Sequence, residues 1–409
     1  MIQNTIFTPA DILLPDYAPD GENWSKWAVI ACDQFTSEPE YWQAAEQDAA
    51  GAMSTLGLIL PEVYLGTPAE QIRDSEIQKN MGTICEKLHS YPDSMIYLER
   101  TLPDGKVRRG IVGKVDLEEY DYSHASCSAI RPTEETVVER IPPRVAVRRR
   151  AAVELPHVML LMDDPKNQVI APLAAQKADM KLLYSFPLMQ GGGYAAGYRI
   201  AGNVQERLLG VLADYEAQRQ GSVVYAVGDG NHSLASAAAY YAELKDTLGA
   251  EAAKTHPARY ALVEIVNLYD PSLEFEPIYR LLKNCDPADV LAELEKSASG
   301  AGTVTVVTGI EEREVSLPGG HALDVGCLQI FIDGYIKSHP GVVCDYIHGA
   351  DSLRTLSKVE GCLGFFCAGV DKESLFPYVT ANGSLPRKTF SMGEAKSKRY
   401  YLEARKIIL

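Results

Sequence analysis

The residues best suited to chemistry lie in one short stretch, GDGNHS, at residues 228–233. Asp229 and His232 flank a point where the chain turns, and both side chains can transfer protons or hold a metal-bound nucleotide. The first backbone N–H groups of a helix have no internal acceptor, and the helix dipole adds partial positive charge there. A helix that begins at this turn would therefore accept a phosphate or a carboxylate.

The flanking residues predict a strand before this turn and a helix after it. Residues 223–227 are apolar and largely β-branched, which is typical of a buried strand, and the chain is rich in alanine from Ser233 onward. The pattern equally fits an ordinary turn in which glycines relieve the backbone, Asn231 or Ser233 caps the helix, and His232 packs locally. The stretch has neither the Gly-Lys-Ser/Thr ending of a Walker loop nor the Gly-x-Gly-x-x-Gly spacing of a dinucleotide site.

Two other regions carry residues that would complete a site. Asp33 follows the apolar run at 27–31, which predicts a carboxylate at the carboxyl end of a core strand; a turn or cap role is the alternative. The charged stretch at 130–155 suits a phosphate or nucleotide site, and a solvated helix face with internal ion pairs explains it as well. The residues in question are Arg131, Thr133, Glu134, Glu135, Arg140 and Arg144.

Composition narrows the classes of function. The formal net charge of −16 opposes nonspecific binding to nucleic acid or to an anionic membrane. The start of the chain does not resemble a signal peptide, and no apolar run reaches transmembrane length. The eight cysteines form no Cys-x-x-Cys pair and the eight histidines no His-x-x-x-His pair. This spacing predicts buried reduced thiols, a cytoplasmic location and no dedicated transition-metal site.

Strand and helix patterns alternate along the chain and predict a mixed α/β protein. A Pro-Asp-Gly turn at 103–105 predicts a β-hairpin, and shorter helices and strands alternate from about residue 286. We therefore expect a main domain over residues 1–285 and a smaller C-terminal α/β domain over 286–409. The basic tail would line a groove or simply solvate the terminus, through Arg387, Lys388, Lys396, Lys398 and Arg399.

Four motifs follow one another along the chain. They are AVIACDQF at 28–35, Arg-Pro-x-Glu-x-Thr at 131–136, Asp-Gly-x-His at 229–232, and Pro-x-Lys-Thr-Phe at 386–390. In this order they resemble the bacterial and archaeal family called domain of unknown function 1015, and the resemblance spans nearly the whole chain. The family's full signature at the third motif is Asp-Gly-His-His-Arg.

The Asp-Gly-x-His-Arg signature is also similar to that of the ParB/sulfiredoxin superfamily, which includes sulfiredoxins, nucleotide-switch ParB domains and free serine kinases. The resemblance implies a ParB/sulfiredoxin-like strand–turn–helix core with mixed sheets, in which nucleotide phosphates lie at the helix start. It also implies that Asp229 and His232 contact phosphate, metal or substrate, and that Gly230 permits close approach to the backbone.

The signature departs from the family at two positions, because Asn231 and Ser233 stand where members have His and Arg. The guanidinium that would hold a phosphate is missing, so that either Arg131, Arg140 or Arg144 supplies the charge or phosphate affinity is weak. The motif also lacks the sulfiredoxin cysteine, which argues against sulfinic-acid chemistry. A DNA-partitioning role does not fit the negative charge or the absence of an evident helix-turn-helix.

The resemblance favours a nucleotide-dependent small-molecule phosphotransferase similar to the free serine kinases, with ATP/ADP and Mg²⁺ as cofactors and an amino acid or similar hydroxyl compound as substrate. In this hypothesis His232 donates to a phosphate oxygen, Asp229 holds Mg²⁺ or substrate, and the base is Asp33 or Glu134. We prefer Asp33 because it ends a buried strand. The predicted phosphate-binding residues are Gly228, Gly230, Asn231, Ser233, Arg131, Thr133, Arg140, Arg144 and Lys388.

Two other functions remain open at this point. One is a non-catalytic nucleotide- or metabolite-binding protein that uses the same turn to sense a ligand, which the missing arginine favours. The other is a metal-dependent phosphate-ester hydrolase, with Asp229 and His232 around a metal-bound water. In each case we expect no nucleic-acid or membrane partner, and the residues do not distinguish among nucleotides, hydroxyl substrates or oligomeric states.

Overall fold

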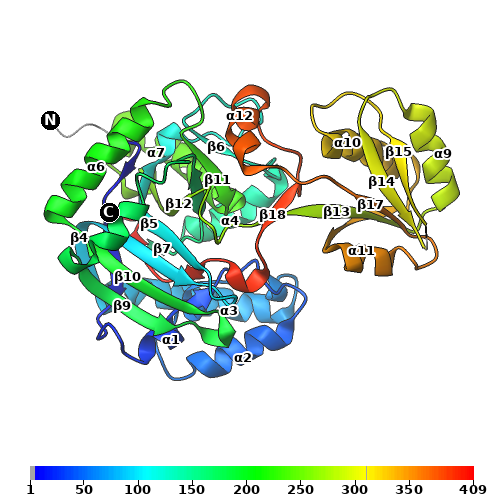
Figure 1. Cartoon of the computed structure of the whole chain (residues 1–409). Coiled ribbons are helices and arrows are strands. Elements are labelled where there is room, and N and C mark those ends of the chain that lie inside the picture. The colour runs from blue at the N-terminus through cyan, green and yellow to red at the C-terminus, as the bar shows by residue number, and fades with distance from the viewer. Residues whose placement is uncertain (1–4, 310) are drawn as a thin grey trace. The chain divides into compact units, whose positions relative to one another are not determined.

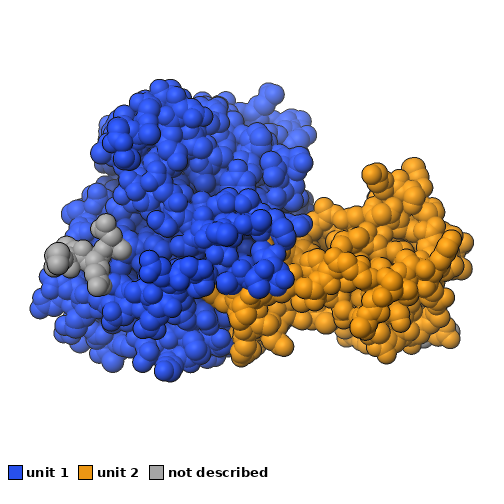
Figure 2. Space-filling model, turned by 90° about the horizontal axis from the view of Figure 1, so that it is seen from above, with its two compact units in different colours: residues 1–273, 379–383, 393–409 blue, residues 274–378, 384–392 orange. Residues whose placement is uncertain are grey.

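Residues 5–309 and 311–409 are described by the computed structural model, in which the chain forms two units (Figure 2). The first unit comprises residues 1–273, 379–383 and 393–409, and the second comprises residues 274–378 and 384–392. The C-terminal residues therefore return to the unit in which the chain begins. The helix α12 (Lys372–Asn382) contributes residues to both units.

The first unit is built on a ten-stranded mixed sheet (Figure 1). Its strands are β1 (Phe7–Thr8), β2 (Ala10–Pro15), β4 (Leu88–Thr101), β5 (Val107–Asp116), β6 (Ile130–Pro132), β8 (Met159–Met162), β9 (Lys181–Pro187), β10 (Tyr194–Ile200), β11 (Tyr225–Asp229) and β12 (Tyr260–Asn267). The order is β6-β11-β8-β12-β5-β4-β10-β9, with β1 beside β5 and β2 beside β4. The pairs β6–β11 and β8–β12 are parallel and the others antiparallel, which confirms the mixed α/β class. The hairpin predicted around residues 103–105 is confirmed as β4–β5.

The central strands of the sheet are buried on both faces. Successive residues of a strand point to opposite sides of the sheet, so neighbours in sequence enter different cores. Tyr97 and Ile111 belong to one hydrophobic core, whereas the adjacent Leu98 and Val112 belong to the other. The first core is covered by α4 (Ile141–Arg148), α6 (Gly202–Ala217) and α7 (Asn231–Leu248). The second core is covered by α1 (Asn23–Trp27), α2 (Pro39–Ala49) and α3 (Pro68–Lys87), on the other side of the sheet in Figure 1. Two short helices, α5 (Ala171–Ala175) and α8 (Ala250–Ala253), also belong to this unit.

Two small ladders attach the C-terminal segment to this unit. The strand β19 (Tyr400–Tyr401) pairs with β3 (Val29–Ile30), and β20 (Arg405–Lys406) pairs with β7 (Val153–Glu154). Both pairings are antiparallel and join residues that are more than half the chain apart in sequence. These pairings fix the position of the side chains just before β19.

The second unit has a six-stranded antiparallel sheet in the order β15-β14-β17-β13-β16, with β18 beside β13. The strands are β13 (Phe275–Lys283), β14 (Thr303–Thr308), β15 (Glu311–Ser316), β16 (Val343–His348), β17 (Leu363–Phe366) and β18 (Phe390–Met392). Helices α9 (Pro287–Ser297) and α10 (Asp324–Ser338) contribute to its main core, and α11 (Ala350–Leu356) contributes to a smaller one. The unit is thus a smaller α/β body.

Two expectations drawn from composition can be compared with the structure. None of the helices in the described part of the chain is both long and apolar enough to cross a bilayer. All eight cysteines are free thiols. Four of them are buried, but Cys127 is exposed and Cys32, Cys85 and Cys344 are only partly buried, so the expectation of buried thiols is confirmed for half of them.

Candidate functional site

The predicted strand, turn and helix around GDGNHS are confirmed as β11, Gly230 and α7. Gly228 lies at a register shift between β11 and β8, a local irregularity that re-aims the strand end. Gly230 has φ +81° and ψ +26°, and a Cβ there would lie 2.9 Å from Val158 Cα, so both backbone angle and space require glycine. The helix begins at Asn231, two residues before Ser233. Gly230 occupies the N-cap position without a side-chain bond, so the prediction that Asn231 or Ser233 caps the helix is wrong.

The segment after β6 runs beside the start of α7 because β6 and β11 are parallel neighbours. The Thr133 hydroxyl donates to the Val227 carbonyl at 2.8 Å, which ties this segment to the end of β11. The Val137 N–H donates to His232 Nε2 at 3.3 Å. Since Nε2 accepts this bond, the proton of the neutral imidazole belongs on Nδ1. Glu134 lies half-buried within the same segment.

Asp229 is paired with a lysine from the far end of the chain. Its Oδ1 accepts the Gly230 N–H at 2.8 Å, and its Oδ2 lies 3.3 Å from Lys398 Nζ. The side chain of Lys398 is only 16% exposed and that of Asp229 only 20%, so water screens this ion pair less than it would at the surface. The turn therefore carries a cation although the family's arginine is missing from it.

Lys398 is held in place by buried arginines that bind the backbone around it. Arg108 donates to the Ser397 carbonyl at 3.0 Å, and Arg100 donates to the Lys396 carbonyl at 3.1 Å. The neighbouring Arg399 lies between the fully buried carboxylates of Glu264 and Glu403, at 2.8 Å and 2.7 Å. These contacts orient the segment that delivers Lys398 to the turn.

Asp33 lies three residues after the end of β3, and the charge of the same lysine acts on it. Its Oδ2 lies 3.8 Å from His157 Nε2, and its Oδ1 accepts from the Gln34 amide at 3.0 Å. Burial opposes ionisation of this carboxyl, but His157, Gln34 and Lys398 together hold its pKa below the ordinary value. Asp33 is therefore an ionised carboxylate at neutral pH, with one third of its side chain exposed.

The neighbouring thiol is not a nucleophile. Burial, with the charge of Asp33, raises the pKa of Cys32 to about 12. Its sulfur accepts a hydrogen bond from the Tyr401 hydroxyl, whose oxygen also lies 2.9 Å from His157 Nδ1. Because only the thiolate attacks, Cys32 is inert at neutral pH and supports the position of His157.

Two buried polar atoms at the start of α7 have no hydrogen-bond partner among the described residues. They are Asn231 Oδ1, on the first helical residue, and Thr136 Oγ1, next to the residue that binds His232. Buried polar atoms normally have a partner, and an unpaired one is costly. A bound ligand at the helix N-terminus is one way in which both would be satisfied.

Of the four predicted basic residues, two are bonded elsewhere, one is exposed in the first unit and one lies in the other unit. Arg131 is buried, and its Nε donates to the Ser128 carbonyl at 2.8 Å. Arg144 pairs with Glu62, and Arg140 is exposed at the start of α4. Lys388 is exposed in the second unit. Of the charged groups near the turn, the contacts thus single out Asp33, Asp229 and Lys398, while the roles of the four basic residues stay predictions.

Sequence reasoning missed His157 and gave Lys398 only a general place in the basic tail. His157 opens an apolar run that reads as a plain core strand, and it precedes Val158, the residue that a Cβ on Gly230 would meet. The available signal was a polar residue at the start of an apolar run.

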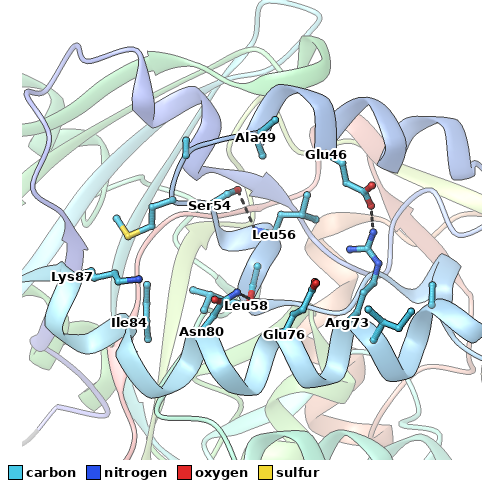
Figure 3. Close-up of a pocket in the computed structure, with 16 residues that line it drawn as sticks. Glu46, Ala49, Ser54, Leu56, Leu58, Arg73, Glu76, Asn80, Ile84 and Lys87 are labelled. Atoms are coloured by element: carbon cyan, nitrogen blue, oxygen red, sulfur yellow. Dashed lines mark hydrogen bonds and ion pairs between the residues drawn. The ribbon is translucent and has the colours of Figure 1, made fainter.

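A separate cavity of about 690 Å³ lies between α2, residues 54–58 and α3 (Figure 3). Two of its charged residues, Glu46 and Arg73, pair with each other, and the Asn80 amide donates to the Gly57 carbonyl. Apolar side chains such as Leu56 and Ile84 make up much of the rest. No residue of the GDGNHS turn lines this cavity, so the chemistry and the cavity are in different places.

The family model described as "Protein of unknown function (DUF1015)" matches residues 14–406, and the chain belongs to that family. This confirms the resemblance drawn from the four motifs. The comparison with curated proteins found no match.

Solved structures that match the chain are distant in sequence. A free serine kinase variant in complex with AMP is 14% identical, with a TM-score of 0.40 and coverage of 74% of this chain and 93% of that chain. A complex of a free serine kinase variant with ADP is 13% identical, with a TM-score of 0.40 and coverage of 75% and 95%. A C-terminally truncated SbnI from Staphylococcus aureus is 9% identical, with a TM-score of 0.37 and coverage of 73% and 87%.

Proposed function

We propose that this DUF1015 protein is a nucleotide-dependent phosphotransferase acting on a small hydroxyl compound. Its strand–turn–helix unit would correspond to a ParB/sulfiredoxin-like core, with nucleotide phosphates at the N-terminus of α7. The observation that carries the proposal is the juxtaposition, at this N-terminus, of an ionised carboxylate, a nearly buried lysine and two unpartnered polar atoms. An anionic substrate at a helix start, flanked by a carboxylate that can accept a proton, is what phosphoryl transfer requires.

The phosphates would be bound mainly by the backbone. The N–H groups in the first turn of an α-helix have no acceptor within the helix, and α7 begins directly after Gly230. His232 would donate from Nδ1, because Nε2 already accepts the Val137 N–H. Asn231 and Thr136 would complete the set, since each has a polar atom left without a partner.

Lys398 would provide the positive charge that the family's arginine supplies elsewhere. Its ammonium lies 3.3 Å from Asp229 Oδ2, and its charge also lowers the pKa of Asp33. An ammonium at this point neutralises charge on the transferred phosphoryl group, as arginine or lysine does in other phosphoryl transfers.

Asp33 would act on the acceptor. As the hydroxyl oxygen attacks the terminal phosphorus, the bond from that phosphorus to the nucleoside diphosphate breaks, and the hydroxyl proton passes to an Asp33 oxygen. The lowered pKa suits a carboxylate that must be ionised before the reaction. His157, 3.8 Å away, orients that carboxylate and stabilises its charge.

A magnesium ion fits the oxygen-only chemistry of Asp33 and Asp229. Both oxygens of Asp229 already have a partner, however, since the Gly230 N–H donates to one and Lys398 lies beside the other. These residues would therefore hold Mg²⁺ together with nucleotide phosphates, and the ion would neutralise charge on the phosphates.

Nucleotide binding is the first test of this proposal. We expect ATP or ADP with Mg²⁺ to raise the melting temperature of the full chain. At a nucleotide concentration about 100 times the dissociation constant, the free energy of unfolding should rise by about 2.7 kcal/mol. ADP release should then be followed with ATP and a panel of hydroxy amino acids. Stabilisation by nucleotide without ADP release from any acceptor would favour a non-catalytic sensor, and no shift with any nucleotide would refute the nucleotide site.

The substitution Lys398→Met tests the role of the lysine. We expect the KM for ATP to rise by at least about tenfold, because one charge-assisted contact of about 1.5–3 kcal/mol is lost. The acidic limb of the pH–rate profile should move to higher pH. Lys398 lowers the pKa of Asp33, so without the lysine that pKa rises and Asp33 becomes protonated at a higher pH. Lys396→Met is the matched control, and an unchanged KM and pH profile in Lys398→Met would contradict the assignment.

A further inference from the structure

Three side chains of the second unit gather where the first turns of α9 meet the end of α10, and the proposed function uses none of them. Asp289 and Glu293 are four residues apart on α9, so they lie on one face of that helix. His339 follows the last residue of α10. Its Nε2 lies 3.4 Å from Asp289 Oδ2 and 4.0 Å from Glu293 Oε1. One ligand atom from each residue lies within 4.8 Å of the other two.

The two separations from His339 Nε2 can be compared with those of ligands around one ion. A charge-assisted hydrogen bond between nitrogen and carboxylate is about 2.7–2.9 Å long, and neither pair comes that close. Bonds of about 2.0–2.1 Å in a tetrahedral site place neighbouring ligand atoms about 3.3 Å apart. The 3.4 Å pair meets this value, and a small side-chain rotation of Glu293 would bring the 4.0 Å pair to it.

The imidazole of His339 is oriented by Tyr335, which is not one of the three side chains. Its Nδ1 lies 3.0 Å from the Tyr335 carbonyl oxygen, and its ring stacks on the Tyr335 ring with centroids 4.0 Å apart. A carbonyl can only accept, so in the neutral ring Nδ1 carries the proton and Nε2 directs a lone pair at the two carboxylates. The Nε2 lone pair and the two carboxylates repel one another unless a cation lies between them. A metal-bound histidine commonly donates its other N–H to a backbone carbonyl in this way.

Tyr335 also holds the first carboxylate. Its hydroxyl donates to Asp289 Oδ2 at 2.7 Å, and its side chain is almost fully buried. One buried residue of α10 thus orients both the imidazole and a carboxylate of α9. Hydrogen bonds of this kind fix the direction of metal ligands.

We propose that Asp289, Glu293 and His339 bind a divalent transition-metal ion, with Zn²⁺ the best fit to one imidazole nitrogen and two carboxylate oxygens. Imidazole disfavours Mg²⁺ and Ca²⁺, which take oxygen ligands. The fourth position faces solvent, because Asp289 and Glu293 are exposed. The ion would join α9 to the end of α10 and so stabilise the second unit. Sequence spacing gave no sign of it, because the histidine is distant in sequence from both carboxylates.

Zinc titration of the metal-free full chain by calorimetry tests the proposal. We expect the wild-type chain to bind Zn²⁺ at a site whose affinity falls by more than about tenfold in His339→Ala and in Asp289→Asn. Asp289→Asn is the milder change, because it keeps the size of the side chain. His348→Ala, at an exposed position of β16 in the same unit, is the matched control and should bind as the wild type does.

Cobalt absorption separates this site from the eight free thiols. Co²⁺ on nitrogen and oxygen ligands would show d–d bands without a thiolate charge-transfer band, and His339→Ala would lose these d–d bands. The proposal is overturned if Zn²⁺ affinity is the same in all the variants, if the Co²⁺ spectrum is that of thiolate ligands, or if the wild-type chain binds neither ion. The last result would leave an ordinary imidazolium–carboxylate group.

Discussion

Asp33→Asn is expected to reduce turnover by about 10²–10⁴-fold while leaving nucleotide affinity nearly unchanged. General-base catalysis typically contributes a factor of that size, and the amide keeps the shape of the side chain but cannot accept the proton. Asp33 lies beside His157 and faces Lys398, and its lowered pKa keeps it ionised at neutral pH. The measurement is ADP release at saturating ATP, together with the nucleotide-induced shift in melting temperature.

The pattern of the two readouts distinguishes catalysis from binding. Lower turnover with an unchanged melting shift is expected of a base, whereas loss of both would mean that Asp33 supports the nucleotide site. Glu134→Gln is the comparison variant, because Glu134 was the other candidate base. If Glu134→Gln alone abolished turnover, the assignment of Asp33 would be wrong.

Arg399→Ala should lower the unfolding free energy of the first unit by about 3–5 kcal/mol, the usual cost of breaking a buried ion pair from one side. The guanidinium lies 2.8 Å from Glu264 and 2.7 Å from Glu403, and both carboxylates are fully buried. Without it two negative charges remain near each other and away from water. All three tryptophans lie in the second core of this unit, so urea unfolding followed by tryptophan fluorescence reports on the correct part of the chain.

Two further variants identify the cause of that loss. Arg149→Ala removes an exposed arginine paired with Glu243 and should cost less than about 1 kcal/mol. Adding Glu264→Gln and Glu403→Gln to Arg399→Ala should recover part of the loss, because no unpaired charge then stays buried. A loss in Arg399→Ala no larger than that in Arg149→Ala would show that the buried carboxylates do not depend on Arg399.

Arg399→Ala also tests how the buried ion pairs are connected to the proposed site. Arg399 is the neighbour of Lys398, and its Nη1 also donates to the carbonyl of Pro156, the residue before His157, at 2.8 Å. Displacing the segment around Arg399 would therefore disturb two groups that face Asp33. We expect weaker nucleotide binding in Arg399→Ala even at temperatures at which the first unit is still folded.

The local parts of the candidate site could be predicted from the sequence. An apolar run, two glycines and an alanine-rich segment are short-range signals, and they correctly predicted β11, the turn at Gly230 and α7. The position of Asp33 after a buried strand followed from the same kind of signal. Strand and helix periodicity depends on residues close in sequence, so such elements can be identified without knowing what packs on them.

Only the tertiary structure decided which cation accompanies the turn. The sequence offered Arg131, Arg140 and Arg144 as replacements for the missing arginine, and the structure instead places Lys398 beside Asp229. That placement depends on the pairing of β19 with β3 and on buried arginines that bind the backbone around Lys398. The sequence by itself determined the strand, the turn, the helix and the carboxylates at their ends. The lysine came from tertiary structure, because pairing between segments so distant in sequence depends on how the whole core packs.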